Sequence, residues 1–324
     1  MKKLNFIIKY GLALLLLSFY SCESWLNVTP SDRLSEEMLF NDREGFVKAL
    51  NGVYIELNTN ELYGRNLTAG ALDVMGQYYS VASSSHAFYN YGGLVYTGND
   101  EKALFDNMWQ KCYAVIACCN TIIEKCDERQ DVLPGVYYGL YKGEALALRA
   151  MLHLDMLRLF GPVYDETSKT AECIPYVTNT DAQISPLLSA EVVLESVIGD
   201  LKTALNLLKE SDPVLTDGVR NEGNSIGDNA LNYRQFRLNY YAVKALLVRA
   251  YAWGHDESNA LVTAEEILRE VQVEGAEIFP FVTHAAATDV SKPDRVFSSE
   301  VMFSLYDSYR GTEIQDKLFL PTLD

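Results

Sequence analysis

A tyrosine-rich segment is the first place in this sequence where residue types and spacing suggest chemistry. The nineteen residues from 78 to 96 hold five of the chain's 21 tyrosines: Tyr78, Tyr79, Tyr89, Tyr91 and Tyr96. Flat aromatic faces with polar tips suit the C–H faces and hydroxyls of sugar rings, and the nearby amide of Asn90 suits vicinal hydroxyls. We therefore predict that these six residues contact a ligand. The alternative is that the tyrosines pack the segment onto helices or face a partner protein.

Other polar residues do not form a catalytic motif. Glu144 and Arg149 are predicted to pair with each other or with neighbouring helices, and Asn120 to bond a neighbouring backbone carbonyl. His153 and Asp155 lie two apart on a predicted helix and point away from each other, so they cannot act as a dyad. The sequence contains no nucleophile elbow, zinc-protease motif, P-loop or dinucleotide-binding glycine pattern. We predict no catalytic residues and no cofactor, although a glycan-processing enzyme with two facing carboxylates remains an alternative.

The cysteines and histidines do not predict a metal site. Cys112, Cys119 and Cys126 recur every seven residues on one helical face, as small buried apolar residues do. The four histidines are scattered along the sequence and supply no convergent ligands at tight spacing. A Gly- and Asn-rich stretch, residues 217–229, is a second candidate contact or cation site, but a solvated loop is the favoured interpretation.

The N-terminus has the pattern of a bacterial export signal. Lys2, Lys3 and Lys9 precede an apolar run at residues 10–20, which is too short to span a bilayer. The signal ends at Ser21 and Cys22, which looks like a lipoprotein signal whose cysteine receives the acyl chains. We predict a signal peptide over residues 1–21 and lipid attachment at Cys22. An ordinary secretory signal is the alternative, and both place the protein outside the cytoplasm.

The charge balance excludes one class of partner. The chain carries 27 basic and 44 acidic residues, a formal net charge of −17, and no basic patch interrupts this balance. Such a surface repels phosphate backbones, so we predict no nucleic-acid partner. Acidic surfaces are not drawn electrostatically to membranes either, and attachment would depend on the acyl chains.

Helical periodicity dominates the elements that must position these residues. Asn41 with Glu44 is typical of a capping box. Gly161 and Pro162 are typical of a helix end, and Ser189 of a helix start. The predicted helices begin near Asn41 and cover residues 105–126, 136–160, 189–208, 233–253 and 257–273. Residues 277–282 and 300–306 have the composition of short β-prone pieces.

Small residues at the predicted helix contacts indicate close antiparallel packing of the tetratricopeptide kind. Alanines recur in the helices at 136–160, 233–253 and 257–273, without a strict 34-residue period. The predicted fold class is mostly α, a superhelix of tetratricopeptide-like helix pairs with irregular inserted loops and a few short strands.

Five segments, in order, carry a resemblance to a known family. They are WQKCYAVIACCNTIIEKC (109–126), YKGEALALRAMLHLDMLRLFGPV (141–163), SAEVVLESVIGDLKTALNLL (189–208), NYYAVKALLVRAYAW (239–253) and SSEVMFSLY (298–306). Together with the opening CESWLNVTPSDRLSEEMLF (22–40), they resemble the SusD/RagB family of outer-membrane nutrient-binding lipoproteins. The resemblance covers residues 22–324, which we treat as one SusD-like α-helical domain.

The resemblance implies a function that the residues alone do not. A protein of this family is anchored on the outer membrane, binds an oligosaccharide or other nutrient, and passes it to a TonB-dependent transporter of the SusC kind. Family members generally run longer, so we expect this sequence to lack the C-terminal third. A structural helical-repeat adaptor with protein partners only remains the alternative.

Overall fold

The computed structural model describes residues 36–181, 183–219, 229–273 and 277–319. The chain divides into two units, residues 1–41 and 42–324. Within the first unit, α2 covers Glu36–Leu39. The second unit is built mainly from α-helices, whose bounds are α3 Arg43–Leu57, α4 Ala71–Met75, α5 Tyr89–Gly92, α6 Asn99–Glu128, α7 Tyr137–Phe160, α8 Ala190–Lys209, α9 Val214–Asp217, α10 Tyr240–Trp253, α11 Glu257–Val271, α12 His284–Ala287 and α13 Asp316–Leu318.

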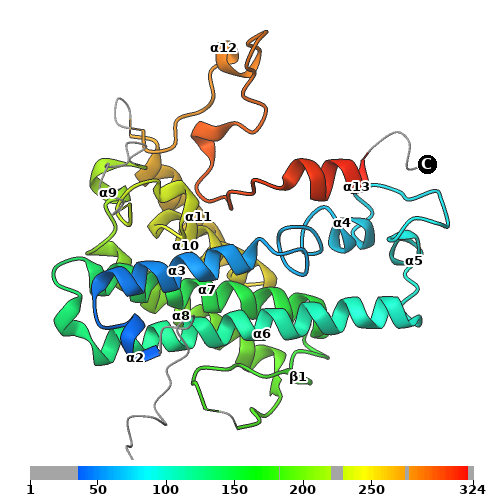
Figure 1. Ribbon diagram of the computed structural model, residues 1–324, viewed down its shortest axis with the longest axis horizontal. Helices are drawn as coiled ribbons and strands as arrows, with labels where there is room; N and C mark the ends of the chain where they lie inside the picture. The colour runs from blue at the N-terminus through cyan, green and yellow to red at the C-terminus, as the bar shows by residue number, and fades with distance from the viewer. Residues whose placement is uncertain (1–35, 182, 220–228, 274–276, 320–324) are drawn as a thin grey trace, which may run out of the picture. The chain divides into compact units, whose positions relative to one another are not determined.

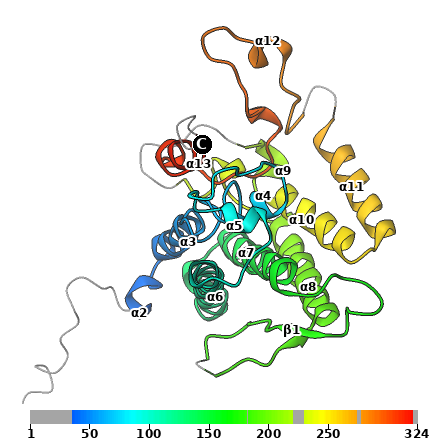
Figure 2. The ribbon, with the colours of Figure 1, turned by 90° about the vertical axis from the view of Figure 1, so that its right-hand side faces the viewer.

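The long helices of the second unit pack side by side in pairs. α3 packs on α6, α6 on α7, α7 on α8, α8 on α10, and α10 on α11 (Figures 1 and 2). α7 lies at the centre of this series, and its residues from Leu140 to Leu157 are almost all buried. The predicted fold class, mostly α with stacked helix pairs and irregular insertions, is confirmed.

Small residues permit the closest of these contacts. A Cβ added to Gly143 on α7 would lie 2.8 Å from Leu208 Cγ of α8, and one added to Gly254 would lie 2.6 Å from Leu194 Cδ2. Ala145, Ala147 and Ala150 of α7 are also fully buried. The predicted close packing through small side chains is therefore confirmed for α7, and Gly254 gives a close contact of the end of α10 with α8.

Several predicted element boundaries need correction. Asp42, not Asn41, caps α3, and its carboxylate accepts a hydrogen bond of 2.9 Å from the Gly45 amide. α10 begins at Tyr240, seven residues later than predicted, because the Asn239 side chain caps it there by accepting from the Ala242 amide.

The β structure also lies elsewhere than predicted. Among the described residues the strands are β1 Glu172–Ile174 and β2 Leu188–Ser189, which form one antiparallel pair between α7 and α8. The described residues of the β-prone pieces at 277–282 and 300–306 form no strand, so that prediction was wrong.

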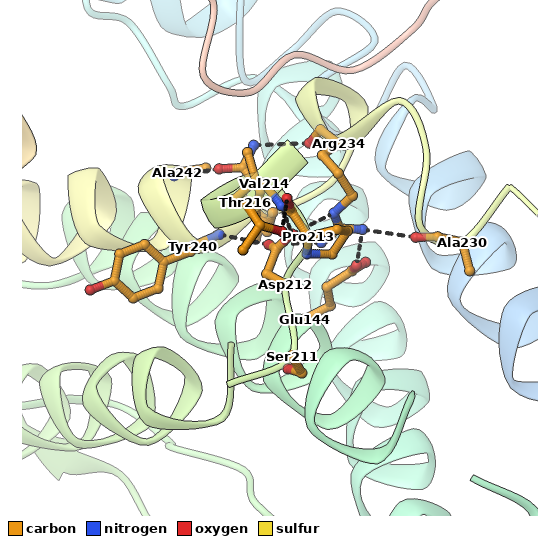
Figure 3. A network of polar contacts seen from close by, with 12 residues as sticks. Glu144, Ser211, Asp212, Pro213, Val214, Thr216, Ala230, Arg234, Tyr240 and Ala242 are labelled. Carbon is orange, nitrogen blue, oxygen red and sulfur yellow. Dashed lines mark hydrogen bonds and ion pairs between the residues drawn. The ribbon is translucent and has the colours of Figure 1, made fainter. Parts of the chain in front are cut away.

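A buried ion network fixes the irregular segment before α10. The Arg234 side chain is fully buried and forms a bidentate pair with Asp212, at 2.9 and 3.1 Å, and a 2.6 Å bond to Glu144 of α7 (Figure 3). Tyr54 of α3 donates to the second oxygen of Glu144, and the Tyr240 amide donates to Asp212. The network therefore ties α3, α7 and the start of α10 to one buried point.

The same segment holds a distant part of the chain. Asn239, beside the network, donates from Nδ2 to the Arg234 carbonyl at 2.9 Å and to the Met302 carbonyl at 2.7 Å. The Ser304 amide donates to the Gln235 carbonyl at 2.9 Å. Residues 302–304 are thereby fixed against the helical core, and they lead into residues 307–313, some of which line a polar hollow described below.

Candidate functional site

The predicted tyrosines divide into exposed and packed groups. Tyr78, Tyr89 and Tyr96 are 84%, 42% and 36% exposed. Tyr91 is 2% exposed, and Tyr79 is half-buried with its hydroxyl donating to the Ala69 carbonyl. The first three therefore have ring surface free for a ligand. Tyr91 and Tyr79 instead pack the segment onto its neighbours, as the alternative interpretation predicts.

A small apolar core lies beside the exposed tyrosines and contacts the ring of Tyr96. Tyr91 of α5 packs edge-on against Phe88 and Phe105, with ring centroids 5.7 and 6.0 Å apart. Tyr96 packs edge-on against Phe105 at 5.4 Å, and Phe105 against Phe160 at the end of α7. Burial raises the pKa of Tyr91 and of Tyr79 to about 12, so both stay neutral at physiological pH. The tyrosine segment is thus tied by aromatic contacts to the ends of α6 and α7.

The amide nitrogen of the Asn90 side chain is hydrogen-bonded within the protein. Its Nδ2 donates to Glu101 Oε1 at 2.7 Å, and this hydrogen bond is the main cause that lowers the pKa of Glu101. The Asn90 side chain is exposed, so its amide oxygen is the atom left for a ligand hydroxyl. Glu101 is in the first turn of α6, where a carboxylate is also favoured by the helix dipole.

A polar hollow lies on the turn that follows α3. It has a volume of about 360 Å³ and is lined by Asn58, Asn60, Glu61, Asp307, Tyr309 and Glu313, among others. Asn58 donates to the Tyr306 carbonyl and Asn60 to Glu313, both at 3.0 Å, so the two walls are joined. Tyr306 and Tyr309 are 72% and 71% exposed. Amides, carboxylates and free aromatic faces are the groups that bind polyhydroxylated ligands.

The hollow and the tyrosine segment share a supporting core. Ile314 and Leu318, which follow the hollow in the sequence, pack on the cluster that contains Val74, Phe88 and Tyr91. Tyr79 packs edge-on against Phe319 with ring centroids 5.1 Å apart. Residues 307–319 therefore connect the two surfaces, and together the surfaces form the candidate site.

The Glu313 carboxylate of the hollow is poorly suited to act as a catalytic acid. Glu313 accepts hydrogen bonds from Lys317 at 2.5 Å and from Asn60, and these bonds lower its pKa. A carboxylate held ionised in this way is a weak proton donor at neutral pH, whereas a glycosidase acid needs a raised pKa.

Sequence reasoning missed the hollow. Its two walls lie about 250 residues apart, and the stretch around Tyr306 and Tyr309 was interpreted as β-prone and loop. The pair of tyrosines three residues apart was the available signal, but no periodicity links it to Asn58 or Asn60.

Comparison with known proteins places the chain in a family. A sequence profile of the SusD-like family, described as starch-binding and associating with the outer membrane, matches residues 24–216, more than half of the chain. The chain belongs to the SusD-like family.

Curated relatives of this SusD-like chain come from Formosa agariphila. SusD-like protein P38 is 27% identical over 202 residues, which cover 57% of this chain and 34% of the relative. SusD-like protein P2 is 25% identical over 211 residues, covering 64% of this chain and 38% of the relative. The matched region thus spans little more than a third of these relatives.

Solved structures share the SusD-like fold. A SusD-like carbohydrate binding protein from Bacteroides vulgatus aligns with a TM-score of 0.56 at 24% identity, covering 72% of this chain and 46% of its own. A SusD homolog from Bacteroides thetaiotaomicron aligns with a TM-score of 0.55 at 21% identity, covering 75% of this chain and 43% of its own. At these identities the likeness establishes the fold.

Two further findings concern the described residues of the SusD-like chain. None of the helices they form is both long and apolar enough to cross a bilayer. In the same part of the chain, no three His, Cys, Asp or Glu side chains gather as metal ligands. Cys22, the predicted lipid attachment site, lies outside the described residues.

Proposed function

We propose that this SusD-like chain binds a glycan at the cell surface and delivers it, chemically unchanged, to a SusC-like TonB-dependent transporter. Residues 1–21 act as its export signal. Residues 22–324 form one SusD-like domain, attached to the outer membrane through acyl chains on Cys22.

The exposed tyrosines carry this proposal. Tyr78 and Tyr89 present free ring surface, and their chain neighbours Tyr79 and Phe88 pack in the apolar cluster, so the backbone that carries the two rings is fixed before a ligand arrives. A preformed aromatic platform avoids part of the entropy cost of binding. Tyr309 and the amides of the adjoining hollow offer the hydrogen bonds and second ring that a sugar chain needs.

The experiment is affinity electrophoresis of the purified chain in gels that contain soluble polysaccharides, beginning with starch and extending to other plant and algal glycans. We expect retardation by at least one glycan, and the double variant Tyr78→Ala with Tyr89→Ala to migrate freely. Both side chains are solvent-exposed, so the helical far-UV spectrum should not change.

The matched control is Tyr78→Phe with Tyr89→Phe, which keeps both rings and should keep most of the retardation. Wild-type migration unaffected by every glycan in the panel would refute glycan binding. Retardation that survives the double alanine variant would remove the tyrosine segment from the site.

A further inference from the structure

A second pocket lies between the ends of α7 and α10 and the turn after α3. It has a volume of about 290 Å³ and is lined by Tyr63, Asp155, Arg158, Arg249 and Trp253, together with three leucines. This volume is near the lower end for small-molecule pockets, which suits one monomer unit. No residue of this pocket belongs to the tyrosine segment or to the polar hollow.

The pocket carries an excess of positive charge. Arg158 Nη1 and Arg249 Nη2 both donate to the same atom, Asp155 Oδ1, at 3.1 and 2.8 Å. The other oxygen of Asp155 accepts from the Tyr63 hydroxyl at 2.7 Å. One carboxylate therefore serves two guanidinium groups, and the local charge is positive although the whole chain is strongly acidic.

Both guanidinium groups keep donors for a ligand. Within the part of the chain that the structure describes, each makes a hydrogen bond only to Asp155, which leaves about four N–H groups on each. The Arg158 and Arg249 side chains are 34% and 44% exposed, so these donors are reachable from solvent. Paired guanidinium groups are suited to oxyanions, which they bind through charge-assisted and often bidentate hydrogen bonds.

The remaining walls suit the body of a sugar. The Arg158 guanidinium lies 5.5 Å from the centre of the Trp253 ring, which orients both side chains. The Trp253 indole N–H finds no acceptor among the described residues. Leucine side chains and an indole provide the apolar surface that the C–H face of a sugar ring covers.

We propose that this pocket binds an anionic sugar residue, through its carboxylate or sulfate ester, as part of the bound glycan. The inference rests on the proposed function and narrows its ligand class to acidic glycans. Salt at physiological concentration screens repulsion by the acidic surface beyond about 8 Å. At contact distance the two arginines therefore dominate the electrostatic energy of a bound anion.

Calorimetric titration of the full chain with three oligosaccharides of equal length tests the inference. The probes are an oligogalacturonate, its neutral methyl ester, and a sulfated oligosaccharide. We expect an anionic probe to bind at least tenfold more tightly than the ester, and Arg249→Met to abolish this preference. The carboxylate is the recognised group if the uronate binds more tightly, and the sulfate ester if the sulfated probe does.

Matched variants separate pocket from surface charge. Arg249→Met leaves Asp155 bonded to Arg158 and Tyr63, so the fold should persist, and Arg249→Lys should show an intermediate preference because it keeps the charge without the fork. Arg269→Met, on the exposed face of α11, removes the same charge elsewhere and should leave the preference unchanged.

The failures are distinguishable. Equal affinity for the ester and both anionic probes would overturn the inference while glycan binding stands, as would an anion preference that survives Arg249→Met. No binding of any probe or polysaccharide would overturn glycan binding and this inference together.

Discussion

Arg234 stabilises the fold by neutralising two buried carboxylates, those of Glu144 and Asp212. Removing it leaves Glu144 and Asp212 buried and uncompensated, which typically costs about 3–5 kcal/mol. We expect Arg234→Met to lower the free energy of unfolding by that amount in urea denaturation.

Lys48→Met provides the comparison for Arg234→Met. Lys48 pairs with Glu44 on the exposed surface of α3, where solvent screens the pair, so its loss should change the free energy of unfolding far less. Equal losses in the two variants would contradict the structural role of the buried network.

His153 makes stability depend on pH. Burial lowers its pKa from the ordinary 6.5 to about 3. Nδ1 faces the Arg149 carbonyl at 2.9 Å and Nε2 accepts from the Val177 amide at 3.0 Å, so the neutral ring is fully bonded. A second ring proton would displace the Val177 bond.

The sign of the pH effect follows from these two values. Between pH 6.5 and about 3 the unfolded chain binds a proton at His153 and the native chain does not. The contribution of neutral His153 to the free energy of unfolding is therefore complete above pH 6.5. It decreases as the pH falls below 6.5, by up to about 1.4 kcal/mol per pH unit. We expect His153→Gln, which can keep both bonds, to flatten the decrease between pH 6.5 and 4.5. Parallel stability curves for wild type and variant would refute this.

Single polar residues were partly predictable from their surroundings in the sequence. Asn120 on an apolar helical face was predicted to bond backbone carbonyls, and it donates to those of Val177 and Asn179 at 3.1 Å. For Glu144 and Arg149 the sequence left two alternatives open, an ion pair with each other or partners on neighbouring helices. The structure pairs Arg149 with Asp200 and Glu144 with Arg234. These partners lie 51 and 90 residues away, and local periodicity carries no information at such separations.

At the scale of elements, we expect the packing of the segment between α4 and α6 to depend on the ring of Tyr91. We expect Tyr91→Ala to leave a cavity among Phe88, Tyr96 and Phe105 at a cost of about 3 kcal/mol, because these rings lose their contact with Tyr91. Hydrogen exchange should accelerate at amides 88–97 and remain slow in the centres of α7 and α8.

Tyr91→Phe keeps the ring contacts and should exchange as wild type does. Unchanged protection at residues 88–97 in Tyr91→Ala would show that the rings above it are ordered by other contacts.

Helices were predictable where a stripe of apolar residues faces one neighbour. In α8, the predicted stripe Val193, Val197, Leu201, Ala204 and Leu208 is entirely buried, and the buried Cys112, Cys119 and Cys126 of α6 confirm their interpretation as apolar residues. The start of α10 was not predictable in this way. The apolar pattern continues back to Tyr233, whereas the cap at Asn239 is held by contacts with distant residues, from Asn239 to the Met302 carbonyl and from the Tyr240 amide to Asp212.

At the scale of the whole molecule, attachment to the membrane is predicted to depend on Cys22. The chain is acidic, so acyl chains must supply the binding energy. We expect Cys22→Ala to move the protein from the membrane fraction to the soluble extracellular or periplasmic fraction.

Cys118→Ala, which removes an exposed thiol from α6, should leave the protein with the membranes. Sedimentation of Cys22→Ala with the membrane fraction would refute lipidation at this residue.

The fold and family were predictable from ordered segments, but half of the candidate site was not. The tyrosine segment stands out by composition within nineteen residues. The walls of the hollow are brought together by bonds between distant residues, from Asn58 to the Tyr306 carbonyl and from Asn60 to Glu313, which no local pattern in the sequence reveals.

Phe160 connects the tyrosine segment to the arginine pocket at the end of α7. Its ring braces Phe105 beneath the tyrosines, while its immediate predecessors, Arg158 and Leu159, line the pocket on the last turn of α7. We expect a change in the size of the Phe160 side chain to alter the packing of both the tyrosine segment and the pocket. Under the proposed function, a substitution at Phe160 is therefore expected to alter ligand preference at both surfaces together.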